Sequence, residues 1–334
     1  MIDGELTPPP ADTRVPSWVR EILTRGLSPR PSARWPSVLE LLEALRRGAQ
    51  LRRVAVTRLP RPRYAESDGV HLAYVTVGSG ALDVVLINGW IASMRAMFEH
   101  ERMTETVGTL SQLGRLVLFD KRGTGLSDRV QALPTYAQRV DDLRAVLDAV
   151  GARDALLVGV SEGAGLALLF ANAYPERTRG LAICGGFARM TEAPDYPWGY
   201  SEAELQRLRR YIRNRWGDGG SMRALCPSRL SEPAYVDWIS AIEREGASPG
   251  GALELLEMNA ALDLRPELAK VTVPTTVLFA SEDKMTHPAA GAFLAREIPG
   301  ARHVVVEGDD HTLLFDHHDV LLRELERLAA LGRS

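Results

Sequence analysis

Short apolar runs that favour β-strands recur along most of the chain from about Tyr64 onward. The first, HLAYVTV, alternates apolar and polar residues and ends in the turn GSG. The later runs are almost continuously apolar, which is typical of strands buried on both faces of a parallel sheet. They are DVVLIN (83–88), RLVLFD (115–120), ALLVGV (155–160), GLAIC (180–184), PTTVLFA (274–280) and HVVVE (303–307).

Helical patterns separate these runs, and such an alternation predicts a mostly parallel, doubly wound α/β sheet. Residues 187–270 break the rhythm, since they hold no convincing strand but several amphipathic segments such as SEAELQRLRRYIRNRW. We expect this insertion to form a helical cap over the strand ends. The helices between strands are expected at 95–112, 134–150, 162–175, 287–297 and 317–331.

The first part of the chain has a different character. Helical patterns cover 17–27 and VLELLEALRRG, and the basic, proline-punctuated segment that follows is typical of a linker. The sequence therefore predicts a helical extension at 1–50, a linker at 51–62 and an α/β domain at 63–334 with its cap at about 187–270.

Composition narrows the class of protein and the compartment. The 334 residues are 45% hydrophobic and 25% charged, with a net charge of −3, which is ordinary for a globular protein and gives no sign of nucleic-acid binding. Two cysteines make no disulfide framework, and the first residues lack the pattern of a signal peptide. No apolar run has the length of a membrane helix. We expect a cytoplasmic protein with no nucleic-acid or membrane partner.

The stretch LLVGVSEGAG contains the pattern G-x-S-x-G around Ser161. The same pattern occurs in GASPG (246–250), but that match follows a polar run and has Pro249 after the serine, so we interpret it as a loop. Ser161 follows a strand and precedes an apolar helix, which is the context that a nucleophilic serine on a sharp turn requires. Ser161 is therefore the candidate nucleophile.

A nucleophilic serine needs a base and an acid, which in this architecture follow it in the order acid, histidine. Of the seven histidines, His311 lies in GDDHTLLF, just past a strand end, and is the candidate base. The strand PTTVLFA ends in SEDK, which offers two carboxylates. We prefer Asp283, which is farther past the strand end, and keep Glu282 as the alternative.

Acyl transfer also needs donors for the oxyanion, the negatively charged oxygen of the tetrahedral intermediate. The candidates are the backbone N–H groups of Glu162, directly after the serine, and of Trp90, in the loop after DVVLIN. We expect the Glu162 side chain to cap the helix start and to point away from the pocket. Its destination would be the helix surface or a basic partner such as Lys121 or Arg122.

From about Arg63 to its end the chain resembles the α/β-hydrolase superfamily, and in particular the hydrolase domains of bacterial signalling proteins. The resemblance implies Ser161 as nucleophile, Asp283 as acid and His311 as base, with no metal or other cofactor. One position departs from the pattern, because most relatives have histidine where this chain has Asn88. In those relatives the histidine usually braces the oxyanion loop, so we expect this loop to be braced differently here. The matching stretches are NGW (88–90), FDKRGTGLSD (119–128), GVSEG (159–163), SED (281–283) and GDDH (308–311).

A second resemblance concerns VPSWVREILTRGLSPRPSARWPSVLELLEALRR, which is similar to the last helices of a serine/threonine protein kinase C-lobe. Arg34 matches the arginine that pairs there with a glutamate of the activation segment. The chain has no kinase phosphate loop, H-R-D or D-F-G sequence, so the segment cannot phosphorylate. The resemblance implies a kinase or other signalling domain in cis, and the alternative is a generic helical extension.

Two function hypotheses follow. The first is a serine hydrolase that cleaves a small ester, lactone or related acyl substrate, and perhydrolase or C–C bond hydrolase chemistry would use the same residues. The second is a non-catalytic sensor of a small ligand. In the cap, we interpret the basic residues as a solvated face and the aromatic residues as packing. The alternatives are an arginine that attracts an acidic substrate and one or two aromatic residues that line the pocket. The residues concerned are Arg207, Arg209, Arg210, Arg213, Arg215, Trp198, Tyr200, Trp216 and Trp238.

Overall fold

The computed structural model describes residues 17–28, 30–51, 56–130, 132 and 134–332. The chain divides into two compact units, residues 1–55 and residues 56–334. Residues 1–16, in the predicted extension, and 52–55, in the predicted linker, lie outside the described residues.

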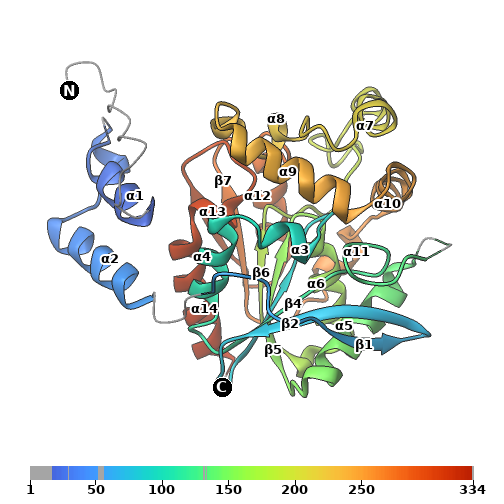
Figure 1. Cartoon of the computed structure of the whole chain (residues 1–334), viewed down its shortest axis with the longest axis horizontal. Coiled ribbons are helices and arrows are strands. Elements are labelled where there is room, and N and C mark those ends of the chain that lie inside the picture. Colours follow the sequence, from blue (N-terminus) through green and yellow to red (C-terminus); the bar gives the residue numbers. More distant parts are fainter. Residues whose placement is uncertain (1–16, 29, 52–55, 131, 133, 333–334) are drawn as a thin grey trace. The chain divides into compact units, whose positions relative to one another are not determined.

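The second unit is built on an eight-stranded sheet with the order β1-β2-β4-β3-β5-β6-β7-β8 (Figure 1). β2 runs antiparallel to both β1 and β4, and all other neighbouring strands are parallel. The predicted mostly parallel α/β fold is thereby confirmed. The strands are β1 (Arg63–Ser67), β2 (Val70–Val77), β3 (Asp83–Ile87), β4 (Arg115–Phe119), β5 (Ala155–Val160), β6 (Thr178–Cys184), β7 (Thr275–Ala280) and β8 (Arg302–Val306).

Helices cover both faces of the sheet because the central strands are apolar on both sides. Leu157 and Ile183 belong to a core that includes apolar residues of α5 (Tyr136–Val150), α6 (Gly163–Ala173) and α12 (Pro288–Glu297). The preceding residue, Leu156, faces the other way, where α14 (His318–Leu331) packs on β6. Successive side chains of a strand point to opposite faces, so each central strand contributes to both layers.

The helix expected at 95–112 is two helices, α3 (Met94–Met97) and α4 (Glu101–Leu110). Each has its own start signal, since the Ser93 side chain accepts a hydrogen bond from the N–H of Ala96 and the His100 side chain accepts one from Arg102. Side-chain caps of this kind satisfy the first N–H groups of a helix and favour a new start.

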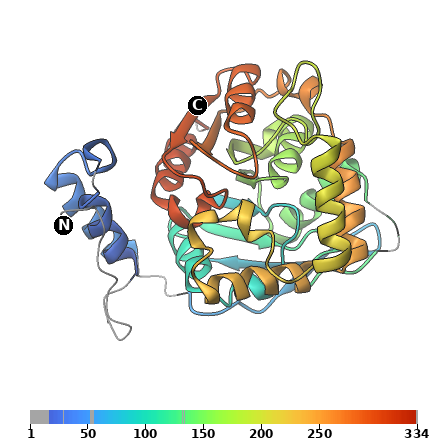
Figure 2. The same ribbon diagram turned by 90° about the horizontal axis from the view of Figure 1, so that it is seen from above.

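Residues between β6 and β7 form helices rather than strands, and α7 packs on α10 while α9 packs on α3 (Figures 1 and 2). The second G-x-S-x-G match lies here. Ser248 accepts a hydrogen bond from Gly251 N and caps α10, so it has a structural role. The helices are α7 (Glu202–Arg215), α8 (Met222–Leu225), η3 (Pro227–Arg229), α9 (Pro233–Gly246), α10 (Pro249–Ala261) and α11 (Arg265–Leu268).

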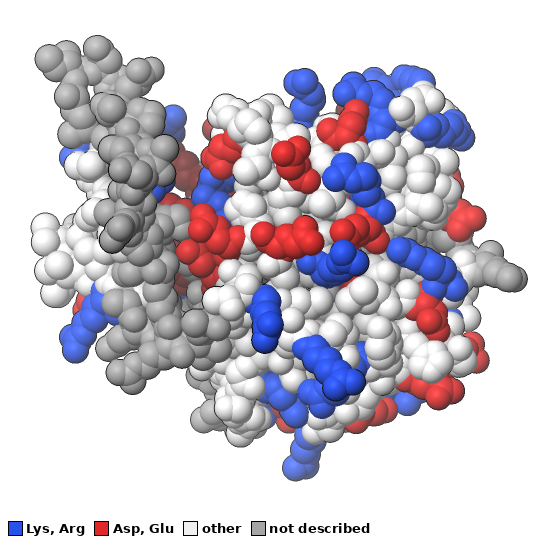
Figure 3. Space-filling model, in the orientation of Figure 1, with Lys and Arg blue, Asp and Glu red and all other residues white. Residues whose placement is uncertain are grey.

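Basic side chains gather over α7 at the surface (Figure 3). Arg209 pairs with Glu202 and Glu257, and Arg215 pairs with Asp218. The partner carboxylates lie at the surface, although the Arg209 side chain is only 15% exposed, and surface ion pairs typically contribute about 0–1 kcal/mol to stability. This arrangement favours the interpretation as a solvated face over attraction of an acidic substrate.

The first unit contains α1 (Ser17–Gly26), the 3₁₀ helix η1 (Pro31–Ala33) and α2 (Val38–Leu51). Arg34 is exposed, and its Nε donates a hydrogen bond to the carbonyl oxygen of Ser28 at 2.7 Å. The resemblance of this segment to a kinase C-lobe stays a prediction. In the described part of the whole chain, no helix combines the length and the apolar character that crossing a membrane requires.

The central strand β5 provides a test of this core. Leu157 is fully buried, so Leu157→Ala is expected to lower the free energy of unfolding by about 2–5 kcal/mol through lost burial and a cavity. Urea denaturation of the purified protein measures it. The matched control is Leu230→Ala, at a side chain that is 43% exposed, which is expected to change stability by about 0.5 kcal/mol or less. Equal losses in the two variants would contradict the packing described.

Candidate active site

Ser161 occupies a sharp turn between β5 and α6. Its φ of 53° is a left-handed conformation that residues other than glycine rarely adopt. The turn needs glycine on both sides, because a Cβ on Gly159 would lie 2.5 Å from the Cα of Ala164, and one on Gly163 would lie 2.4 Å from the carbonyl oxygen of Asn88. The strand–turn–helix geometry predicted for G-x-S-x-G is therefore present.

His311 and Asp283 form a buried pair. Nδ1 of His311 lies 2.7 Å from Oδ2 of Asp283, and the two side chains are 3% and 0% exposed. Oδ1 of Asp283 accepts hydrogen bonds from the N–H groups of Met285 and Thr286 at 2.8 and 2.9 Å. The carboxylate is thus fixed and in turn fixes the imidazole. The alternative acid, Glu282, is 70% exposed and lies 3.7 Å from Lys284.

Ser161 and His311 approach the same turn at the end of β6. The N–H of Ser161 donates to the carbonyl oxygen of Cys184 at 2.8 Å. A Cβ on the next residue, Gly185, would lie 2.8 Å from Cε1 of His311, so only glycine leaves room for the ring there. Nε2 of His311 is buried and has no hydrogen-bond partner among the described residues. This nitrogen is available to exchange a proton with a reacting group.

The loop after β3 lies against the serine. A Cβ on Gly89 would lie 3.2 Å from the Cβ of Ser161, which places the segment Asn88–Gly89–Trp90 beside the turn. On the other side, the first N–H groups of α6 have no helical carbonyl to bond. The two predicted oxyanion donors, the N–H groups of Trp90 and Glu162, thus belong to the two segments that border Ser161.

The Glu162 side chain points into the protein, and only part of the expectation for it is confirmed. Its carboxylate is 2% exposed and pairs with Lys121, as predicted, and with Arg139 at 2.6 Å. Of the alternative destinations, the structure selects Lys121, and Arg122 pairs with Asp142. The expectation that the side chain caps the helix start was wrong, since the carboxylate makes no capping hydrogen bond to α6. Burial would raise the pKa of Glu162, but the two cations hold it below its usual value.

The turn after β4 is hydrogen-bonded to the start of α3, which follows the loop of Trp90. The Asp120 carboxylate accepts hydrogen bonds from the N–H groups of Met94 and Leu126, and burial raises its pKa to about 7. The hydroxyl of Ser127 donates to the carbonyl oxygen of Asp120 at 2.6 Å. Sequence reasoning missed Arg139, whose pairing with Glu162 spans 23 positions and leaves no local signal.

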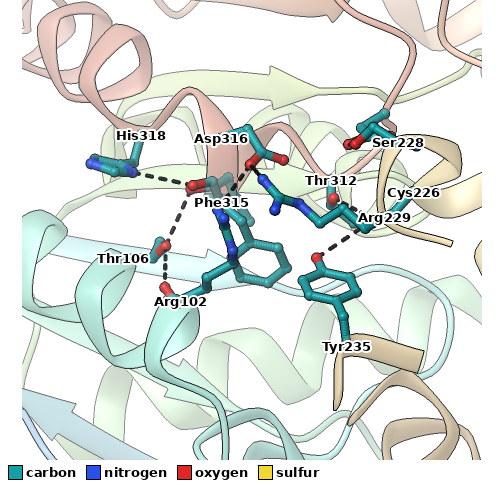
Figure 4. Close-up of polar contacts among 12 residues, drawn as sticks. Arg102, Thr106, Cys226, Ser228, Arg229, Tyr235, Thr312, Phe315, Asp316 and His318 are labelled. Carbon is teal, nitrogen blue, oxygen red and sulfur yellow. Dashed lines mark hydrogen bonds and ion pairs between the residues drawn. The ribbon is translucent and has the colours of Figure 1, made fainter. Parts of the chain in front are cut away.

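The segment that carries His311 is fastened to the cap. The N–H of His311 donates to the carbonyl oxygen of Leu225 at 2.8 Å, so the two segments run side by side. Figure 4 shows Arg102 and Arg229 converging on Asp316, at 2.9 and 2.5 Å. Two further contacts join the segments: Ser228 with Asp310, and Cys226 with Thr312. The position of the histidine therefore depends on that of the cap.

The loop after β3 borders an apolar and aromatic part of the cap. Trp90 packs beside Trp216, with 5.8 Å between ring centroids. Ile91 and Phe187 pack against the same cluster of buried cap residues. Trp238 packs elsewhere, against His100 and Phe315. The buried residues of the cluster are Met190, Leu205, Ile212, Ala247, Ala252 and Leu256.

The sheet order, the left-handed serine and the buried His–Asp pair together define an α/β-hydrolase. The family model Hydrolase_4, described as "Serine aminopeptidase, S33", matches residues 89–318. The chain therefore belongs to this family and is a hydrolase.

Similar proteins and solved structures are consistent with this family assignment. A pimeloyl-[acyl-carrier protein] methyl ester esterase of Neisseria meningitidis is 29% identical over 75% of this chain and 92% of its own length. The 3-oxoadipate enol-lactonase 2 of Acinetobacter baylyi is 24% identical over 71% of this chain and 85% of its own. Among structures, a bromoperoxidase from Bacillus anthracis has a TM-score of 0.71 at 22% identity, over 81% of this chain and 100% of that one, which shows the shared fold.

The two neighbouring carboxylates offer a direct comparison. Asp283→Asn removes the acceptor that holds Nδ1 of His311 and is expected to lower kcat by about 10²–10⁴. Glu282→Gln, at an exposed side chain, is expected to leave kcat close to that of the wild type. Hydrolysis of p-nitrophenyl butyrate measures both, with thermal unfolding to show that each variant is folded. If Glu282→Gln alone lost most of its activity, the assignment of Asp283 as the acid would be wrong.

Proposed function

We propose that this protein is a serine hydrolase that cleaves an ester, lactone or related acyl substrate through an acyl-enzyme on Ser161. One observation carries the proposal: the buried His311 ring is bonded through Nδ1 to Asp283, while Nε2 has no hydrogen-bond partner among the described residues. A side chain held in this way can act as a general base toward a neighbouring hydroxyl.

The proposed reaction has two halves. His311 takes the proton of the Ser161 hydroxyl through Nε2 as the oxygen attacks the substrate carbonyl, and Asp283 stabilises the imidazolium. The N–H groups of Trp90 and Glu162 hold the oxyanion, and the alcohol leaves with the proton from His311. Water then attacks the acyl-enzyme, with His311 again as base, and releases the acid.

The esterase and lactonase among the relatives favour esters or lactones over other acyl substrates. The partly buried apolar side chains of Trp90, Ile91 and Phe187 favour an uncharged, apolar acyl group, since apolar surface is stabilised by burial against hydrocarbon. Arg209 and Arg215 are paired with cap carboxylates, which gives no support for recruitment of an acidic substrate by these two residues.

Two wider proposals rest on the sequence. The first is a cytoplasmic location, which the free, buried Cys184 and Cys226 support. The second is that the helical extension links the hydrolase to a kinase or other signalling domain in cis, which only the resemblance supports.

A fluorophosphonate probe tests the nucleophile. The wild type and Ser248→Ala, which alters the second G-x-S-x-G match, are expected to be labelled at Ser161, and Ser161→Ala is expected to remain unlabelled. Peptide mass spectrometry identifies the site. Absence of an adduct at Ser161 in folded wild-type protein would overturn the proposal and favour a ligand sensor.

A series of p-nitrophenyl esters tests the substrate class. We expect kcat/KM to rise with acyl length from acetate, because each buried CH₂ contributes about 0.8 kcal/mol, until the pocket is full. The hemisuccinate ester, matched in length but acidic, is expected to be hydrolysed more slowly than the butyrate. Faster hydrolysis of the hemisuccinate would instead support the alternative in which a cap arginine attracts an acidic substrate.

A further inference from the structure

A buried ionic cluster lies behind the loop that carries Trp90. Lys121, at the start of the turn after β4, has a side chain that is 3% exposed. Its Nζ donates to the carbonyl oxygens of Asn88 at 3.1 Å and Gly89 at 2.7 Å, and it also bonds the Glu162 carboxylate. These partners account for all three donors of the ammonium group.

Glu162 holds this lysine in place. One carboxylate oxygen bonds Lys121, and the other accepts hydrogen bonds from Arg139 at 2.6 Å and from the hydroxyl of Tyr136 at 3.3 Å. The Arg139 side chain is 1% exposed. The three charged side chains, Lys121, Glu162 and Arg139, are buried. None of them can turn to water to satisfy its charge, so the arrangement is rigid.

The hydrogen bond from Lys121 to the carbonyl oxygen of Gly89 fixes the orientation of the peptide between Gly89 and Trp90. The carbonyl oxygen of Gly89 and the N–H of Trp90 belong to one peptide unit, which is planar and trans, so they point in opposite directions. A cation that fixes the carbonyl on one side therefore fixes the N–H on the other. The side-chain nitrogen of Asn88 supplies no such brace, since Nδ2 is buried and has no hydrogen-bond partner among the described residues.

We propose that Lys121 is a positioning residue that aims the N–H of Trp90 at the oxyanion, and that the Glu162 carboxylate positions Lys121. Glu162 thus serves twice, through its own N–H as one donor and through its side chain as the anchor of the other. This inference rests on the proposed function, because the oxyanion exists only if Ser161 attacks a carbonyl.

Charge in the cluster supports the same role. It contains two cations, Lys121 and Arg139, and one anion, Glu162, and two of the nitrogens of Arg139, Nε and Nη2, have no partner among the described residues. The ammonium group of Lys121 lies behind the peptide that faces the developing oxyanion. In a poorly solvated site, such a fixed charge stabilises the anion more than it would in water.

The test replaces Lys121 with an uncharged side chain of similar length. Lys121→Met is expected to lower kcat for p-nitrophenyl butyrate by about 10- to 100-fold, somewhat less than outright loss of an oxyanion donor, with KM little changed. Affinity for a trifluoromethyl ketone, which forms a charged tetrahedral adduct, is expected to fall in the same proportion. If Lys121 had only a structural role, Lys121→Met would lower stability, but kcat and inhibitor affinity would not fall in the same proportion.

Arg122→Met is the matched control. Arg122 is the next residue, is also buried, and forms an ion pair with Asp142 that does not contact the oxyanion loop. The control is expected to lose stability but to keep kcat and inhibitor affinity. Glu162→Gln, which keeps the N–H and the shape but loses the charge, is expected to lie between the wild type and Lys121→Met, and it tests the proposal if Lys121→Met does not fold.

Hydrogen exchange in the free protein gives a readout that needs no activity. In Lys121→Met, the backbone amides of residues 88–91 are expected to exchange faster than in the wild type, whereas Arg122→Met leaves them unchanged. If wild-type Ser161 is not labelled by fluorophosphonate, the proposed function fails, and the exchange data still decide whether Lys121 holds the loop. Wild-type kcat and wild-type exchange in Lys121→Met would overturn the inference.

The pH profile adds a signature. Burial lowers the pKa of Lys121 to about 8, against the attraction of Glu162, and the other groups that face it are Arg139 and Asp120. As pH rises through 8 the ammonium loses its charge and one donor, so kcat is expected to fall in the wild type. In Lys121→Met this limb is expected to be absent, while any change near pH 7 from Asp120 remains. An alkaline limb that persists in Lys121→Met would contradict the assignment.

Discussion

The site depends on how closely α6 returns onto β5. Side chains at Gly159 or Gly163 would collide with Ala164 and with the end of β3, so the serine between them must take a left-handed conformation. The cost of that conformation, on the order of 1–3 kcal/mol, is offset by the packing of an apolar strand and helix in the core. The same closeness brings the loop after β3 against Ser161, so one turn places both the proposed nucleophile and the peptide proposed to bind the oxyanion.

Buried charges then hold the parts around this turn. Lys121, Glu162 and Arg139 join the turn after β4, the turn at Ser161 and α5. On the other side, Arg102 and Arg229 meet at Asp316 and join α4 and the cap to the segment after His311. A buried charge is costly without a partner, so each cluster restrains several segments at once. The loop after β3 and His311 are thereby positioned by segments outside their own strands.

Sequence reasoning recovered most of the fold because its signals are local. The central strands are continuous apolar runs, and the order of Ser161, Asp283 and His311 at strand ends could be read directly. β1 was missed, since RYAES is short, polar at the edge of the sheet and recognisable only once β2 pairs with it. The break between α3 and α4 depends on a cap by His100, a residue without a strong capping preference.

What the sequence determined by itself is the strand–turn–helix at Ser161, because glycine spacing and apolar periodicity act over a few residues. The direction of the Glu162 carboxylate was decided only by the tertiary structure. Its partners lie 41 and 23 positions away, and both the helix surface and Arg122 were equally compatible with the local pattern. A buried carboxylate must be matched by whichever cations the folded chain brings to it, and that depends on how β4, α5 and α6 pack together.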